Sequence, residues 1–264
     1  MKRFLSVFGL FVLVSCAPQR QGVLLSPVVA PIVKPFVEPI VGQIESEKTI
    51  KPQLGPQSGQ PLGLPSEINL EVPFYSQAPD GNWSLPWQEA CEEASAILAY
   101  HFVVGGSLDL AQHKKELNAL FDWQKQHFGD YKDTTIEQTA EMIRGYWGFD
   151  RLRIVENPTV EQIKEALAEG DPVIAPFSGR DLKNPFYSNQ GPYYHMLVIK
   201  GYDSTGFITN DVGTKQGHNY RYPFDHLMSA LHDWNPTDIL LGAKRVIVLE
   251  GGMKAFSKAN REGF

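Results

Sequence analysis

The chain has 264 residues, of which 42% are hydrophobic and 20% are charged, values typical of a soluble globular protein. This length suffices for one good-sized domain or two small ones. The formal net charge of −6 and the lack of a dense run of lysine and arginine argue against nucleic acid as the main partner.

Residues 1–16 have the pattern of a secretory signal peptide. Lys2 and Arg3 precede an apolar run at 4–14, which is too short to span a bilayer because a spanning helix needs about 20 apolar residues. The letters LVSC resemble a bacterial lipobox, which implies cleavage before Cys16 and lipid attachment to its thiol. We therefore expect an exported protein, lipid-anchored to a bacterial membrane, with its folded part facing the periplasm or the exterior. Ala17 favours the outer membrane if there is one.

Residues 17–66 differ in composition from the rest of the chain. Prolines recur at a four-residue step, at positions 27, 31, 35 and 39. This density opposes helix and sheet pairing and favours extended polyproline II, which at about 3.1 Å per residue could reach on the order of 100–150 Å. We interpret the segment as a disordered or extended linker between membrane and folded domain. Two alternatives are a ligand for a partner module and a segment that lies along the lipid or cell-wall surface.

The folded domain is expected over 67–250, with a C-terminal tail at 251–264. A short strand begins near Ile68 in INLEVPFYSQ. Helical spacing and two capping-box signatures predict helices at 91–102, at 109–128, after Thr135/Gln138 and after Thr159/Gln162.

Strands gather in the second half of this domain. Apolar runs bounded by glycine and aspartate predict strands at 172–177, 195–203, 206–211 and 243–250, with a short helix near 225–234. Helices that precede a group of strands indicate an α+β fold.

Cys91 is the one cysteine besides Cys16, so lipidation of Cys16 would leave it without a disulfide partner. An unpaired thiol in an exported protein is either a small core residue or a reactive group. Its place at a predicted helix start favours the thiolate through the helix dipole, whereas Glu89, Glu92 and Glu93 oppose it. We expect these carboxylates to act weakly near solvent, so that an ion pair with a histidine prevails.

Among the seven histidines, His195 is the best placed to act as a base. It follows the aromatic loop NPFYSNQGPYY and opens the strand MLVIKGYD, a rigid position beside a loop. If this strand pairs with the next one through the GYDST turn, Asn210 and Asp211 approach His195, and one of them could accept its Nδ1–H. Alternation of side chains allows only one of the two to face His195 and does not choose between them.

Five motifs in order, namely VPFYSQAP, ACEEASAILAYHF, GDPVIAPF, HMLVIKGYD and ITNDVG, resemble the peptidase C39-like family over roughly residues 68–250. The resemblance implies a papain-like cysteine proteinase fold with N-terminal helices packed on an antiparallel β-sheet. It also implies a set of roles: Cys91 as nucleophile, His195 as general base and acid, Asp211 as the residue that orients it, and Gln77, with Gln88 as the rival, in the oxyanion hole beside the Cys91 N–H.

The resemblance implies a thiol peptidase that acts on a peptide or protein through an acyl-enzyme thioester, with no metal or cofactor. A zinc site lacks the usual ligand spacing in this sequence. Glu92 departs from the pattern, because many family members have glycine there. Two alternatives remain: an inactive module that binds peptides or proteins, and an enzyme that cleaves or cross-links cell-wall peptides.

Overall fold

The structure is a computed structural model and describes residues 63–251. An antiparallel sheet runs through this part of the chain. The predicted signal peptide, the lipidation site Cys16, most of the linker and the tail from 252 onward lie outside these residues. The main path of the sheet has the order β2-β7-β3-β4-β5-β6, and β1 pairs with β4. The strands are β1 (Ile68–Asn69), β2 (Leu152–Glu156), β3 (Val173–Ser178), β4 (Tyr194–Tyr202), β5 (Phe207–Asn210), β6 (Tyr220–Tyr222) and β7 (Arg245–Leu249).

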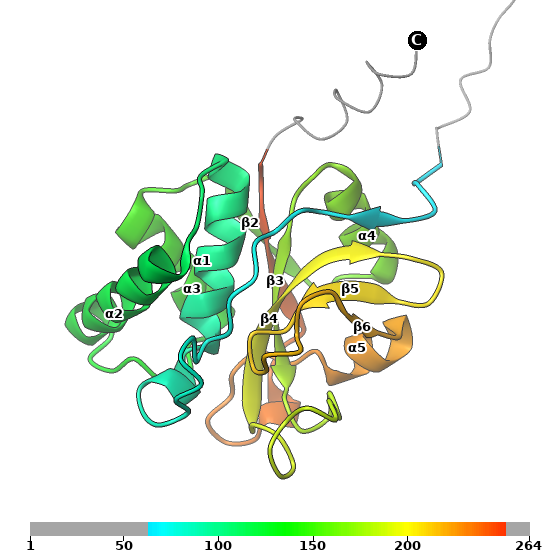
Figure 1. Cartoon of the computed structure of the whole chain (residues 1–264). Coiled ribbons are helices and arrows are strands. Elements are labelled where there is room, and N and C mark those ends of the chain that lie inside the picture. The colour runs from blue at the N-terminus through cyan, green and yellow to red at the C-terminus, as the bar shows by residue number, and fades with distance from the viewer. Residues whose placement is uncertain (1–62, 252–264) are drawn as a thin grey trace, which may run out of the picture. The chain divides into compact units, whose positions relative to one another are not determined.

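The helices cover both faces of this sheet (Figure 1). They are α1 (Cys91–Val104), α2 (Leu110–His127), α3 (Ile136–Trp147), α4 (Val160–Ala168) and α5 (Phe224–Ala230), with 3-10 turns η1 (Trp87–Glu89) and η2 (Ile239–Leu241). Helices α1, α2 and α3 gather on one side, and α4 and α5 lie on the other. The predicted α+β class, with N-terminal helices packed on an antiparallel sheet, is confirmed.

Helix α1 forms the centre of the helical layer. Its side chains are buried almost all round, as in a core helix. The helix packs on β4, which is buried along its whole length, and Ser95 Oγ donates a hydrogen bond of 3.2 Å to the Met196 carbonyl of that strand. This contact joins the layer that begins with Cys91 to the strand that begins beside His195.

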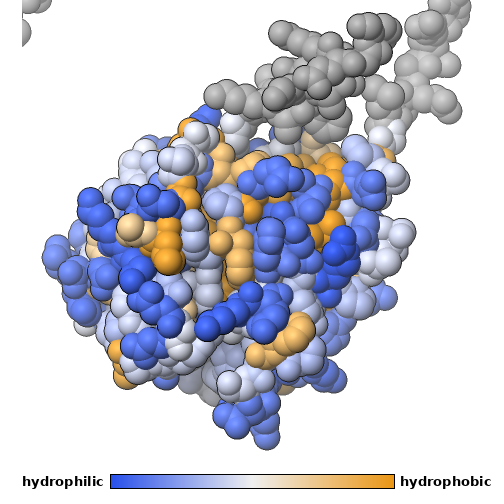
Figure 2. All heavy atoms as spheres, viewed as in Figure 1, coloured by the Kyte–Doolittle hydropathy of each residue, from blue (hydrophilic) through white to orange (hydrophobic). Residues whose placement is uncertain are grey.

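The outer face of this layered unit is mostly polar. Figure 2 shows hydrophilic side chains over most of the visible face, with apolar side chains in separate patches. The apolar mass lies inside, between helices and sheet, as the sequence pattern requires.

The predicted short strand near Ile68 forms and has two residues: Val72 N–H turns back to the Leu70 carbonyl, and Pro73 has no N–H to offer. The structure corrects the prediction at three other elements. The late helix ends at Ala230, four residues early, because Leu231 is extended and bridges to Phe177 of β3. Strands β2 and β6 were not predicted, since one is half-exposed and the other has three residues.

Both predicted capping boxes form, and one gives a stability test. Thr159 Oγ1 accepts the Gln162 N–H, and the Gln162 side chain accepts the Thr159 N–H. Thr159→Ala should lower the free energy of unfolding by about 1 kcal/mol because helix α4 loses its N-cap. Urea unfolding measures the change, and Thr159→Ser, which keeps the hydroxyl, should restore most of it. Equal stability of Thr159→Ala and the parent chain would contradict this account.

Candidate active site

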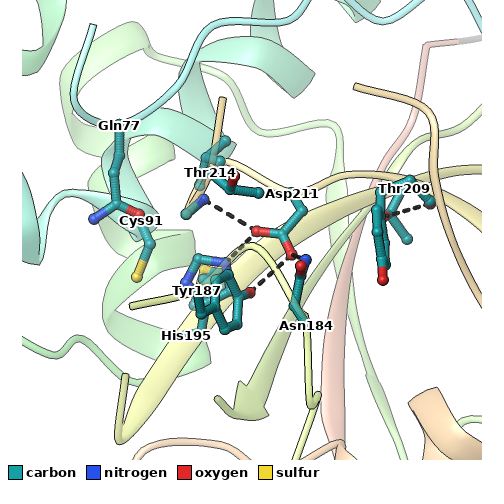
Figure 3. A network of polar contacts seen from close by, with 12 residues as sticks. Gln77, Cys91, Asn184, Tyr187, His195, Thr209, Asp211 and Thr214 are labelled. Carbon is teal, nitrogen blue, oxygen red and sulfur yellow. Dashed lines mark hydrogen bonds and ion pairs between the residues drawn. The ribbon is translucent and has the colours of Figure 1, made fainter. Parts of the chain in front are cut away.

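His195 and Asp211 form a buried hydrogen-bonded pair between neighbouring strands. His195 is the second residue of β4, and Asp211 follows directly after the last residue of β5. The two strands pair antiparallel, as the GYDST turn predicted, which brings these positions to the same end of the sheet. His195 Nε2 lies 2.8 Å from Asp211 Oδ1 (Figure 3).

Four donors besides His195 hold the Asp211 carboxylate. Oδ2 accepts hydrogen bonds from the Tyr222 hydroxyl at 2.6 Å, from the Tyr187 hydroxyl at 2.8 Å and from Asn184 Nδ2 at 2.9 Å. Oδ1 also accepts the Gly213 N–H at 3.0 Å. Burial raises the pKa of Asp211, but the His195 ring and these hydroxyls lower it by more, so its pKa lies below the ordinary value. The carboxylate is therefore ionised at neutral pH.

The geometry resolves the choice that alternation left open. Asn210 points away from His195, and its Nδ2 donates to the carbonyls of Val72 and Pro73. Asp211 faces His195, but through Nε2 instead of the expected Nδ1. Nδ1 is thus the ring nitrogen left for proton exchange with a nucleophile.

Cys91 begins α1, as predicted, but its thiol is engaged differently from the expectation. Its Sγ donates a hydrogen bond of 3.1 Å to Glu92 Oε2, and both side chains are buried. Burial raises the pKa of the Cys91 thiol well above its ordinary value, and the Glu92 carboxylate raises it further. The expectation that these carboxylates act weakly near solvent is wrong for Glu92, because its side chain is buried and bonded to the thiol.

Gln77 lies beside Cys91, but its donors are occupied (Figure 3). Its Nε2 donates to the carbonyls of Trp87 and Gln88, both at 3.0 Å, while its buried Oε1 has no hydrogen-bond partner within residues 63–251. Gln77 thus anchors the η1 turn that leads into α1. The rival Gln88 has an exposed side chain that bonds to Glu89.

A cleft of about 680 Å³ opens over these residues and is lined by both layers. Cys91, Glu92 and Gln77 come from the helical side, and His195 and Gly213 from the sheet side. Exposed aromatic side chains stand at its edge, namely Trp83, Phe186 and Tyr193. The volume lies in the usual range for ligand pockets in proteins.

Three residues that support Asp211 were missed by sequence reasoning. Asn184 and Tyr187 belong to the NPFYSNQ loop, which was noted only as aromatic, and Tyr222 lies on the unpredicted strand β6. No local pattern marks them, because they meet Asp211 only through the tertiary fold. Gly213 is a further requirement, since a Cβ there would lie 2.7 Å from His195 Cε1.

Over 63–251 there is no group of three or more His, Cys, Asp and Glu side chains that could hold a metal ion. No helix in that range is both long and apolar enough to cross a bilayer.

Comparison with known proteins identifies the family. The family model described as Peptidase_C39 like matches residues 69–238, well over half of the chain. The chain belongs to the peptidase C39-like family. Its α+β fold, with N-terminal helices packed on an antiparallel sheet, is the papain-like fold expected for this family.

Two further comparisons concern curated proteins and solved structures. No curated protein matches the chain. A crystal structure of a Bacillus anthracis protein classed as a C39-like peptidase is similar at 15% sequence identity and a TM-score of 0.49, covering 70% of this chain and 97% of that one.

The support of Asp211 can be tested in this C39-like domain without a substrate. Tyr222→Phe removes the 2.6 Å hydrogen bond to the carboxylate and should lower the free energy of unfolding by about 2 kcal/mol, within the range for bonds to charged groups. Denaturant unfolding at pH 7 measures this. Tyr220→Phe on the same strand is the matched control, because its hydroxyl has no hydrogen-bond partner in the described residues, and it should change little.

The difference in unfolding free energy between Tyr222→Phe and the parent chain should depend on pH. The hydrogen bond favours ionised Asp211, whose folded pKa is lowered. Its contribution is complete above the unfolded pKa of about 4 and is lost as pH falls through the folded value. The difference between Tyr222→Phe and the parent chain should shrink over that acidic range. A constant difference would mean that Tyr222 acts by packing alone.

Proposed function

We propose that the chain is a thiol peptidase that cleaves peptide bonds through an acyl-enzyme thioester on Cys91. The observation that supports this best is the buried His195–Asp211 pair in the same cleft as a thiol at a helix N-terminus. Nucleophile, base and orienting carboxylate are the three parts that such chemistry needs.

In the first half-reaction, His195 Nδ1 takes the thiol proton and Sγ attacks the carbonyl carbon of the scissile bond. A new S–C bond forms, and the carbonyl π electrons move to the oxygen. His195 then gives the proton to the leaving amine as the C–N bond breaks. Ionised Asp211, bonded to Nε2, stabilises the imidazolium between these two transfers.

In the second half-reaction, water replaces the amine. His195 takes a proton from the water, whose oxygen attacks the thioester carbon. The S–C bond then breaks with its electron pair going to Sγ, the acid product leaves, and His195 returns the proton to the Cys91 thiolate. The backbone N–H of Cys91 is a donor for the oxyanion in both steps, because the first N–H groups of a helix have no partner within it. Gln77 can add a second donor only by giving up a bond to Trp87 or Gln88.

The proposal includes the site of action. Lipid on Cys16 and the proline-rich linker at 17–66 would hold the domain at a bacterial membrane surface, where it meets exported peptides or proteins. The hydrophobic run at 4–14 and the lipobox-like LVSC sequence support this part.

A second candidate function is a catalytically inactive module that binds peptides in the same cleft. The observation that favours it is the engagement of the Cys91 thiol by Glu92, together with its raised pKa. A neutral thiol is a poor nucleophile.

Product analysis by mass spectrometry separates the two functions. The full chain is incubated with a peptide library and with peptidoglycan stem peptides, and new termini are measured. Cys91→Ala and His195→Ala should each lower kcat/KM by roughly 10³-fold or more. His127→Ala, which changes an exposed histidine of α2, is the matched control and should cleave like the parent. Saturable binding with no Cys91-dependent product would instead establish the inactive module.

A further inference from the structure

The Glu92 carboxylate is fixed directly against the proposed nucleophile. Its Oε2 accepts the Cys91 Sγ hydrogen bond at 3.1 Å, and its Oε1 accepts the Thr134 N–H at 2.9 Å. Glu92 is 2% exposed, so neither oxygen is bound by bulk water. Thr134 lies just before α3, which means that the helical layer itself holds the carboxylate in this position.

No cation balances Glu92 within residues 63–251, where it forms no ion pair. The nearby carboxyl groups are Glu93 on α1 and Asp133 before α3. Glu89 on η1 and the Tyr194 and His195 side chains on β4 line the same cleft. Burial raises the pKa of Glu92 to about 7, and Asp133 adds to the rise, while hydrogen bonds from Cys91 and Thr134 oppose it. A carboxyl group in such surroundings can change charge near neutral pH.

The other nearby carboxylates do not have this geometry. Glu93 is buried, but its Oε1 accepts a hydrogen bond from Gln124 of α2. Glu89 is only half-buried and bonds to the Gln88 side chain. Of these three glutamates, Glu92 is the one whose charge lies against Sγ.

We propose that Glu92 is a positioning residue that holds Cys91 as a neutral thiol, and that the cysteine becomes an active nucleophile when Glu92 takes up a proton. This inference rests on the proposed peptidase function and adds its pH control. A carboxylate and a thiolate in contact repel each other in a buried site, so ionised Glu92 and ionised Cys91 exclude one another.

The resting and the active state of the site differ by one bound proton. The resting site holds a Glu92 carboxylate, a Cys91 thiol and a neutral His195. The active site holds a Glu92 carboxylic acid, a Cys91 thiolate and a His195 imidazolium. One proton comes from water to Glu92, the thiol proton moves to His195 Nδ1, and no electrons are exchanged.

The sign of the pH dependence follows from this balance. As pH rises through the Glu92 pKa of about 7, the carboxylate forms and the active state is lost. The protein should therefore be most active on the acidic side of neutrality, whereas an ordinary thiol becomes more reactive as pH rises. Glu92→Gln keeps the size and an acceptor for Thr134 but removes the charge.

The test is the alkylation rate of Cys91 by iodoacetamide between pH 5 and 9. The full chain is used, and mass spectrometry of the Cys91 peptide separates it from Cys16. At pH 8, Glu92→Gln should react at least about tenfold faster than the parent chain, which corresponds to a fall of one pKa unit or more for the thiol. Glu92→Ala should show the same direction. Glu89→Gln is the matched control and should follow the parent profile.

Each outcome has one meaning. Faster alkylation in both Glu92 variants supports the inference; slower alkylation would make Glu92 a base for the thiol and overturn it. If His195→Ala alters the profile while the Glu92 variants match the parent, the peptidase proposal stands and the Glu92 inference is overturned. If neither residue matters, the peptidase proposal fails as well.

Should both Glu92 variants unfold, as judged by circular dichroism, the alkylation profile of the parent chain decides. A simple rise to pH 9 with one ordinary thiol ionisation contradicts the inference.

Discussion

The buried charge of Asp211 is the constraint on which the site depends. A carboxylate without solvent is stable only when donors surround it, and here an imidazole, two tyrosine hydroxyls, an amide and a backbone N–H fill that role. These donors come from the loop before β4, from β4, from β6 and from the turn after Asp211. The need to satisfy one anion therefore fixes the relative position of four separate segments.

On the helical side, a second buried carboxyl group, that of Glu92, has a pKa shifted in the opposite direction to that of Asp211. Glu92 has two hydrogen-bond donors and acidic neighbours, and burial raises its pKa toward neutrality. The cleft thus places an ionised carboxylate against His195 and a titratable one against Cys91. The two carboxyl pKa values shift in opposite directions, because the contact with His195 and the tyrosine hydroxyls outweigh burial at Asp211, whereas burial dominates at Glu92.

Much of this arrangement was predictable from local patterns. Capping boxes, apolar runs and the Cys91 and His195 motifs located most of the elements and the main site residues. Local patterns failed where contacts between distant segments decide the outcome: the burial of Glu92, the donors of Gln77, and the choice of Asp211 over Asn210. Periodicity describes which face of a segment is apolar, but the burial of a particular charge depends on what another segment places against it.

Cys91 and His195 belong to different layers, joined where α1 packs on β4 and Ser95 bonds to the Met196 carbonyl. Neither layer contains a complete site. Separation of the helices from the sheet, by heat, denaturant or a cut between α3 and β2, would part Cys91 from His195 before either side chain is altered. Any activity that needs both residues would therefore measure the fraction of molecules in which the helical layer and the sheet are still packed together.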